Sequence, residues 1–315
     1  MLNRRNIRSK VMQGIFAFQS ANEDNIPKNE KLLFLSFDNI YKLYVLLLLL
    51  LLALKDKAKE EIEIGLKKNF PTEEDLNPNY KFVNNKVLEM LENNKFIKEF
   101  KKKYKLNKWE VNKELVDLIW KKVKNSKLYK EYISSKSHSF MEDKEFILDL
   151  YKNFIAPEIK LHETLEADES HWADDIAVAN TLVMKTISSL KEGESFQGLP
   201  PLFKDEQDRE FAKKLFTKII LNDDKLTNQI KGKTPNWDYD RISNIDKLIL
   251  KMGIGEFLYF PSIPPSVTIN EYVELAKEFS TPKSNIFING VLNNIYKELQ
   301  QKGELNKNIR GLDKK

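Results

Sequence analysis

The 315-residue sequence contains no cysteine, and this absence excludes several kinds of protein. A disulfide framework, a thiolate metal site and a cysteine nucleophile all require that residue. Histidine is nearly as scarce, because only His138, His162 and His171 occur, and no two of them have the spacing of metal ligands on one helical face. A chain without cysteine fits a reducing compartment, so we expect a cytoplasmic protein.

Glycine and proline are also few, with 10 and 11 residues. No glycine-rich loop is present that could cradle a phosphate, which disfavours a nucleotide-binding α/β enzyme. Acidic pairs such as Asp223 and Asp224 are more simply explained as solvated charges at turns or helix starts. The sequence therefore gives no support to a catalytic site, and we expect no enzyme and no metal or other cofactor.

The chain also lacks an apolar run long enough to cross a bilayer. Its longest, residues 43–54, has seven consecutive leucines but spans only twelve residues between Lys42 and Lys55. A membrane-spanning helix needs ~20 apolar residues. The arginines near the N-terminus are not followed by the apolar core of a secretory signal. We therefore expect residues 43–54 to form a buried helix in a protein that does not contact the membrane.

Helix-forming residues dominate the composition, and apolar residues recur at helical spacing in almost every window. Ile7, Val11, Ile15 and Phe18 are one such series, and no segment alternates like a half-buried strand. About ten helices fit between the breaks at glycine and proline, so the sequence predicts an all-α protein.

The formal net charge is only +5, so a nucleic-acid partner would need a local basic patch.

Part of the chain matches itself at an offset of 65 residues without a gap. Asp143 and Phe146 coincide with Asp208 and Phe211, and several apolar positions follow. Trp172 also coincides with Trp237, and because the chain has only four tryptophans, this match is informative. Chance agreement between two amphipathic helical regions is the alternative to a diverged internal repeat, and a duplication is the interpretation we favour.

The C-terminal third carries a long ordered series of residues that resembles the NusB family. The matching pieces are Asp240-Arg241, Ile245-Asp246-Lys247, Glu256, Ile263-Pro264, Val267, Ile269-Asn270-Glu271, Glu274-Leu275-Ala276-Lys277, Phe279, Ser284 and Phe287-Ile288-Asn289-Gly290-Val291-Leu292. At the other end, Arg4-Arg5-Asn6-Ile7-Arg8 with Gln13 and Phe16 resembles the arginine-rich first helix of that family.

The resemblance implies NusB-like helical bundles interrupted by an extra module. Residues 1–21 would form the first helix of the core, 22–205 an inserted helical module, 206–301 the rest of the core and 302–315 a basic flexible tail. It also implies transcription antitermination, chiefly on ribosomal RNA operons. The expected partners are single-stranded boxA RNA, the small-subunit ribosomal protein NusE and the transcription elongation complex.

Two other functions compete with this one. An RNA methyltransferase with a NusB-like domain would need an α/β nucleotide-binding domain, whose strands and glycines are missing here. The alternative that stays open is a helical scaffold that has kept the fold but binds only proteins.

For the RNA surface we predict Arg4, Arg5, Arg8 and Phe287. At ~100° per residue, the arginines form a basic strip beside the apolar face of the first helix. Phe287 falls at the edge of the buried face of the last helix, where a ring can stack on an unpaired base while guanidinium groups contact phosphates. The alternative for Phe287 is that it completes the core.

For the protein partner the resemblance indicates Phe16, Asp246 and Leu250. Phe16 points away from the apolar face of its helix, and the helical wheel places Asp246 on an accessible flank beside Leu250. Structural roles are expected for the neighbouring residues: Thr268 and Glu271 as a capping box, Ser284 as an N-cap, and Gly290 as a point of close approach.

Overall fold

The computed structural model describes residues 2–308 except 170, 195, 197 and 234–238, and these residues form helices and no strand. The all-α prediction is confirmed. The α-helices are α1 (Arg4–Ser20), α2 (Ile26–Leu66), α3 (Glu73–Leu76), α4 (Lys86–Asn93), α5 (Lys95–Tyr104), α6 (Lys108–Val111), α7 (Lys113–Asn125), α8 (Lys127–Ser134), α9 (Phe140–Leu150), α10 (Ile159–Asp168), α11 (Trp172–Ser189), α12 (Glu206–Leu221), α13 (Asp223–Ile230), α14 (Asn244–Tyr259), α15 (Pro265–Phe279) and α16 (Ser284–Gln301). A π-helical turn, η1 (Tyr151–Ile155), continues α9, and a 3-10 turn, η2 (Tyr239–Arg241), precedes α14. The prediction of about ten helices is too low because residues 73–134 break into six short ones.

Short polar side chains cap many of the helices at their first turn. In α1 the Asn3 side chain accepts the Asn6 backbone N–H at 2.8 Å, and the Asn6 side chain accepts the Asn3 N–H at 3.2 Å, which makes a capping box. Thr72 forms a second capping box at the start of α3. The side chains that accept a backbone N–H at the starts of other helices are Asn85, Asn94, Ser126, Ser139, Asp205 and Ser243. Each such cap contributes ~1 kcal/mol, so a sequence rich in Asn and Ser can begin a helix at short intervals.

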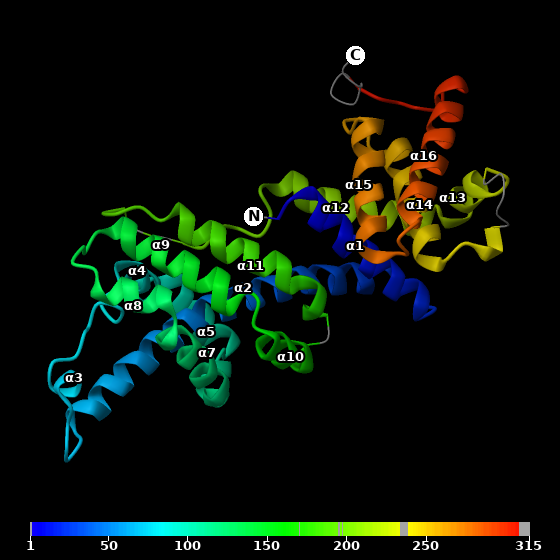
Figure 1. The fold of residues 1–315 in the computed structure, drawn as a ribbon. Helices are drawn as coiled ribbons and strands as arrows, with labels where there is room; N and C mark the ends of the chain where they lie inside the picture. Colours follow the sequence, from blue (N-terminus) through cyan, green and yellow to red (C-terminus); the bar gives the residue numbers. More distant parts are fainter. Residues whose placement is uncertain (1, 170, 195, 197, 234–238, 309–315) are drawn as a thin grey trace. The chain divides into compact units, whose positions relative to one another are not determined.

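The chain divides into two compact units (Figure 1). Unit 1 is Asp38–Leu202, and unit 2 combines Leu2–Phe37 with the chain from Phe203 onward. The boundary falls inside α2, and residues 22–205 contain α2 to α11. That residues 22–205 are an insertion into a shorter fold remains a prediction.

Unit 1 is built on the leucine run of α2. All residues from Leu43 to Leu51 are buried. The Tyr44 hydroxyl lies 2.6 Å from Thr186 Oγ1 of α11, and Trp109 Nε1 of α6 donates to the Leu46 carbonyl at 2.7 Å. By length and composition α2 could cross a membrane, but 67% of its apolar window is buried inside the protein. The prediction of a buried helix is confirmed.

Unit 2 is built around α14, which packs against α1, α12, α13, α15 and α16. Close packing depends on two glycines of α14. A Cβ on Gly253 would lie 2.8 Å from Leu292 Cδ2, and a Cβ on Gly255 would lie 2.2 Å from Ile219 Cδ1. At Gly290 a Cβ would meet no atom within 4 Å, so no other helix of the described chain approaches it closely, and the close approach of a ligand there stays a prediction.

The two units share an order of helices at the offset of 65 residues. Helices α9, α10 and α11 correspond to α12, α13 and α14, and in each set the first two helices pack against the third. The matched residues Asp143 and Asp208 are both buried, and each accepts a hydrogen bond from the first residue of another helix, Lys86 N or Arg4 Nε. Trp237 lies outside the described residues. Duplication therefore remains a hypothesis, supported by these shared contacts.

Candidate functional site

Two arginines at the start of α1 lie at the surface of unit 2. Arg4 donates through Nε to Asp208 Oδ1 of α12 at 2.9 Å, and Arg5 donates through Nη2 to Glu271 Oε1 of α15 at 3.0 Å. Their side chains remain 42% and 41% exposed. Both guanidinium groups are therefore held in place by a carboxylate while part of each faces solvent.

Arg8, the third predicted RNA contact, is buried. Its side chain is 2% exposed, and Nε and Nη2 donate to the two carboxylate oxygens of Glu256 at 2.8 Å each. Burial lowers the pKa of Arg8, but the adjacent Glu256 carboxylate outweighs this effect, and the net direction is upward. The expectation that Arg8 borders an exposed strip is wrong because α15 and α12 cover that side of α1.

Glu256 is the centre of a buried polar network. Besides Arg8 it accepts hydrogen bonds from Thr268 Oγ1 at 2.8 Å and from the Tyr272 hydroxyl at 3.2 Å. Burial, together with the Glu256 charge, raises the pKa of Tyr272 well above its usual value. The network joins α1, α14 and α15, so it fixes the helix that carries the exposed arginines.

The predicted capping box at Thr268 and Glu271 is wrong. Helix α15 begins at Pro265, with Pro at the first position and no side-chain cap, so Thr268 lies within the helix. Glu271 instead accepts from Arg5 and lies 3.5 Å from Arg8 Nη1. The spacing of residues in the sequence could not reveal the ion pairs of Glu271, because Arg5, Arg8 and Glu271 are brought together only by the packing of α1 on α15.

Phe287 is half-buried on the first turn of α16, which agrees with its predicted position at the edge of the buried face. Ser284 is the first residue of α16 and not its N-cap. Its hydroxyl donates to Asp246 Oδ2 at 3.0 Å, which links α16 to α14. Helix α15 packs against both α1, which carries the arginines, and α16, which carries Phe287.

The predicted partner residues have different environments. Phe16 is 41% exposed, as expected. Asp246 is only 7% exposed and Leu250 is fully buried, so the expected accessible flank is wrong. The physical reason is that α14 is covered on all sides by other helices of unit 2, and a helical wheel cannot reveal that environment.

The C-terminal segment contributes a contact that the sequence did not reveal. Lys307 Nζ donates to the carbonyl oxygens of Phe260 and Ile263 at 2.9 Å each, beside the end of α14. Its positive charge there interacts favourably with the partial negative charge at the C-terminal end of the helix. The predicted flexible tail therefore includes an ordered contact at Lys307, and residues 309–315 lie outside the described part of the chain.

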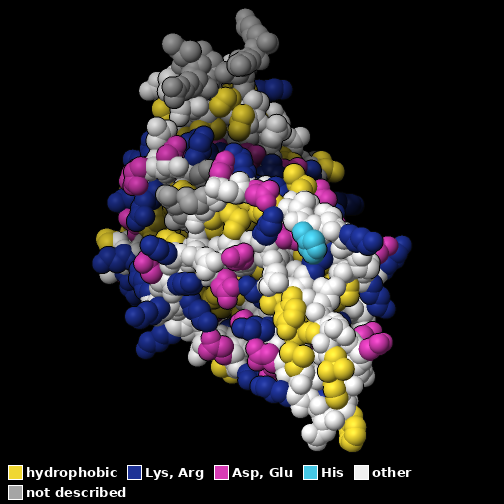
Figure 2. Space-filling view, turned by 90° about the vertical axis from the view of Figure 1, so that its left-hand side faces the viewer, with side chains coloured by type: hydrophobic (Ala, Val, Ile, Leu, Met, Phe, Trp, Pro, Cys, Tyr) yellow, Lys and Arg dark blue, Asp and Glu magenta, His cyan; other side chains and the backbone are white. Residues whose placement is uncertain are grey.

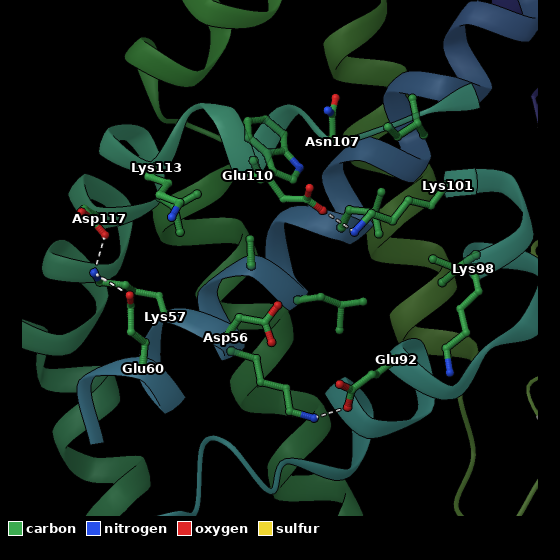
Figure 3. Close-up of a pocket in the computed structure, with 18 residues that line it drawn as sticks. Asp56, Lys57, Glu60, Glu92, Lys98, Lys101, Asn107, Glu110, Lys113 and Asp117 are labelled. Atoms are coloured by element: carbon green, nitrogen blue, oxygen red, sulfur yellow. Dashed lines mark hydrogen bonds and ion pairs between the residues drawn. The ribbon is translucent and has the colours of Figure 1, made fainter. Parts of the chain in front are cut away.

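A cavity of about 580 Å³ in unit 1 is lined by apolar and charged side chains (Figure 3). Its charged residues are five lysines and five carboxylates, most of them joined in ion pairs such as Lys55 with Glu92 at 2.6 Å. Burial and the nearby Glu92 raise the pKa of Asp56 in its lining. Among the described residues, no group of three or more Asp, Glu or His could hold a metal ion.

The chain is similar in sequence to known transcription antitermination proteins. A protein of Salinibacter ruber called transcription antitermination protein NusB is 37% identical over 141 residues, which are 42% of this chain and 88% of that relative. The chain belongs to the NusB family. The sequence model of that family matches residues 177–297, from α11 to α16.

Other members of the NusB family match a smaller part. NusB of Finegoldia magna is 47% identical over 92 residues, which are 29% of this chain and 67% of that protein. The solved structure described as T. maritima NusB is 27% identical and covers 46% of this chain and 92% of its own, with a TM-score of 0.29. A TM-score this low supports no conclusion about the fold.

Proposed function

We propose that this NusB-family protein is a transcription antitermination factor that binds single-stranded boxA-type RNA together with NusE. Family membership is the observation that carries the proposal, since the relatives named above are transcription antitermination proteins. The transcription elongation complex would then be its wider assembly, and the cytoplasm its location.

The half-exposed guanidinium groups of Arg4 and Arg5 support an RNA-binding role. Arginine has five N–H donors, and the pair with Glu271 engages Nε and Nη2 of Arg5. Donors that remain free of this pair can contact phosphates. Arg8 has a different part in this proposal: it holds α1 against Glu256 and so positions the two exposed arginines.

Phe287 would add base stacking to these phosphate contacts. The Phe287 side chain is only half-buried, and stacking of such a ring on an unpaired base would be worth ~1–3 kcal/mol. Phe16, exposed on α1, is the proposed contact for NusE. Asp246 would support that interface indirectly by holding the start of α16 through Ser284, and Leu250 would do so as part of the core beneath it.

Binding of boxA RNA to the full chain, measured with and without NusE over a range of salt concentrations, tests the proposal. We expect Arg5→Gln to weaken binding and to reduce the log–log salt slope by ~0.7 for each phosphate that the variant no longer neutralises. Phe287→Ala should weaken binding with the slope unchanged. Arg209→Gln on α12 is the matched control, because Arg209 is an exposed arginine of the same unit.

The outcomes separate two functions. Equal affinity for RNA in Arg5→Gln and Arg209→Gln would show that Arg5 is not an RNA contact. Binding of NusE without any binding of RNA would favour the protein scaffold instead.

A further inference from the structure

Positive charge is concentrated on one short segment of unit 1. Residues 95–105, which are α5 and the residue that follows it, contain six lysines and one glutamate. Their net charge of +5 equals the formal net charge of the entire chain. The remaining residues are therefore neutral in sum, and Figure 2 shows positive and negative side chains interspersed over the face that it presents.

Ion pairing does not account for this charge. Lys101 forms an ion pair with Glu110 at 2.8 Å, whereas Lys98 forms none with the other residues drawn in Figure 3. Within the described chain no ion pair is formed by Lys95, Lys98, Lys102, Lys103 or Lys105. Helices α7 and α8 also contain six lysines, spread over about twice the length, and three of these are paired with Glu158, Glu61 and Glu131 at 2.6, 2.8 and 3.4 Å.

Helix stability does not account for it either. Lysines in the last turn of α5 favour the helix, because its C-terminal end carries partial negative charge. Lys95 and Lys98 lie in the first turns, where a cation is unfavourable. Lys105 has φ of +50°, a left-handed conformation that glycine or asparagine adopts at lower cost. Three positive charges are thus present where helix stability would favour other residues.

Aromatic rings border the same lysines. Phe96, Phe100 and Tyr104 form a row along α5, with ring centroids 5.8 and 4.4 Å apart. The amino groups of Lys103 and of Lys42 on α2 lie 5.0 and 5.2 Å from the Tyr104 ring centre. These cation–π contacts restrict the two amino groups before any ligand arrives, which reduces the ordering cost of binding.

We propose that this α5 lysine surface, made of Lys42, Lys95, Lys98, Lys102, Lys103 and Lys105, binds the phosphate backbone of single-stranded RNA. The choice of RNA among polyanions rests on the proposed function. Lysines interleaved with aromatic rings are typical of surfaces that bind single strands without regard to sequence. The surface lies outside residues 177–297, so it would give the protein a second RNA contact on unit 1.

The test uses the full chain and a fluorescent oligouridylate of about 20 nucleotides, titrated over a range of salt concentrations. The triple variant Lys98→Gln, Lys102→Gln and Lys105→Gln should lower the log–log salt slope by about two, at ~0.7 for each lysine, and bind about a hundredfold more weakly at 0.1 M salt. The matched control is Lys121→Gln, Lys130→Gln and Lys136→Gln. It removes the same charge from other exposed lysines of unit 1 and should change binding little.

Equal weakening in the two triple variants would overturn the proposal, because general charge would then explain it. Loss of binding to vesicles of phosphatidylglycerol and phosphatidylcholine by the α5 variant, with oligouridylate binding unchanged, would also overturn it in favour of a lipid surface. The variant Arg5→Gln distinguishes a failure of the α5 lysine surface from a failure of the proposed function. If Arg5→Gln weakens boxA binding while the α5 variant binds oligouridylate normally, only the α5 surface fails.

Discussion

At the scale of single residues, the decisive feature is the buried ion pair of Arg8 and Glu256. Both side chains are at most 2% exposed, and Thr268 and Tyr272 also donate to the carboxylate. The helical period of α1 predicted a surface position for Arg8. The pair joins residues 248 positions apart, and no local pattern in the sequence encodes such a contact.

Removal of one member of this pair should be costly. Arg8→Met leaves the Glu256 carboxylate buried without its cation, and we expect the free energy of unfolding to fall by ~3–5 kcal/mol. Adding Glu256→Gln should restore part of that stability, because glutamine keeps an acceptor for Thr268 and Tyr272 without the charge. Urea denaturation measures both changes. Arg209→Met, at an exposed arginine, should alter stability by no more than ~0.5 kcal/mol, and a similar small effect of Arg8→Met would show that the pair is unimportant.

At the scale of elements, the sequence predicted helices well and their environments less well. The leucine run and the apolar series of α1 were correctly assigned to cores, because a long apolar stretch and a clear helical period each have one simple explanation. For α14 the helical wheel gave the wrong exposure for Asp246 and Leu250. It is surrounded by five helices, so Asp246 and Leu250 are buried although they lie away from the centre of its predicted inward face.

Two glycines on helices of unit 2 should respond to alanine in opposite directions. Gly253→Ala would place a Cβ 2.8 Å from Leu292 and 3.4 Å from Tyr272, which lie on different helices, so no single side-chain movement relieves both. We expect a net destabilisation of ~1–2 kcal/mol from overpacking. Gly290→Ala adds a methyl group to open space in an exposed part of α16 and should stabilise the protein by ~0.5–1 kcal/mol. Thermal unfolding of both variants checks this, and a stabilising Gly253→Ala would contradict the tight packing of α14.

At the scale of the whole molecule, the boundary between the two compact units has no mark in the sequence. The unit boundary lies inside α2, at residues 37 and 38, whereas the resemblance placed the start of the inserted module at residue 22. A continuous helical period runs through this position, so the sequence contains no break to mark it. Of the candidate site, Arg4, Arg5 and Phe16 have the predicted exposure, because each depends only on the face of one helix.

Two cores imply two responses to destabilisation. Arg8→Met acts within unit 2, so amide hydrogen exchange should become about 100-fold faster or more in α12, α14, α15 and α16, in line with the expected destabilisation of ~3–5 kcal/mol, and stay unchanged in α7, α9 and α11 of unit 1. Ile147→Ala in the core of α9 is the matched substitution for unit 1. It should cost ~2–5 kcal/mol and produce the reverse pattern. Mass spectrometry of peptides from both units measures the exchange. If either substitution accelerates both units by the same factor, the two cores unfold as one cooperative body, and the division into separately stabilised units is wrong.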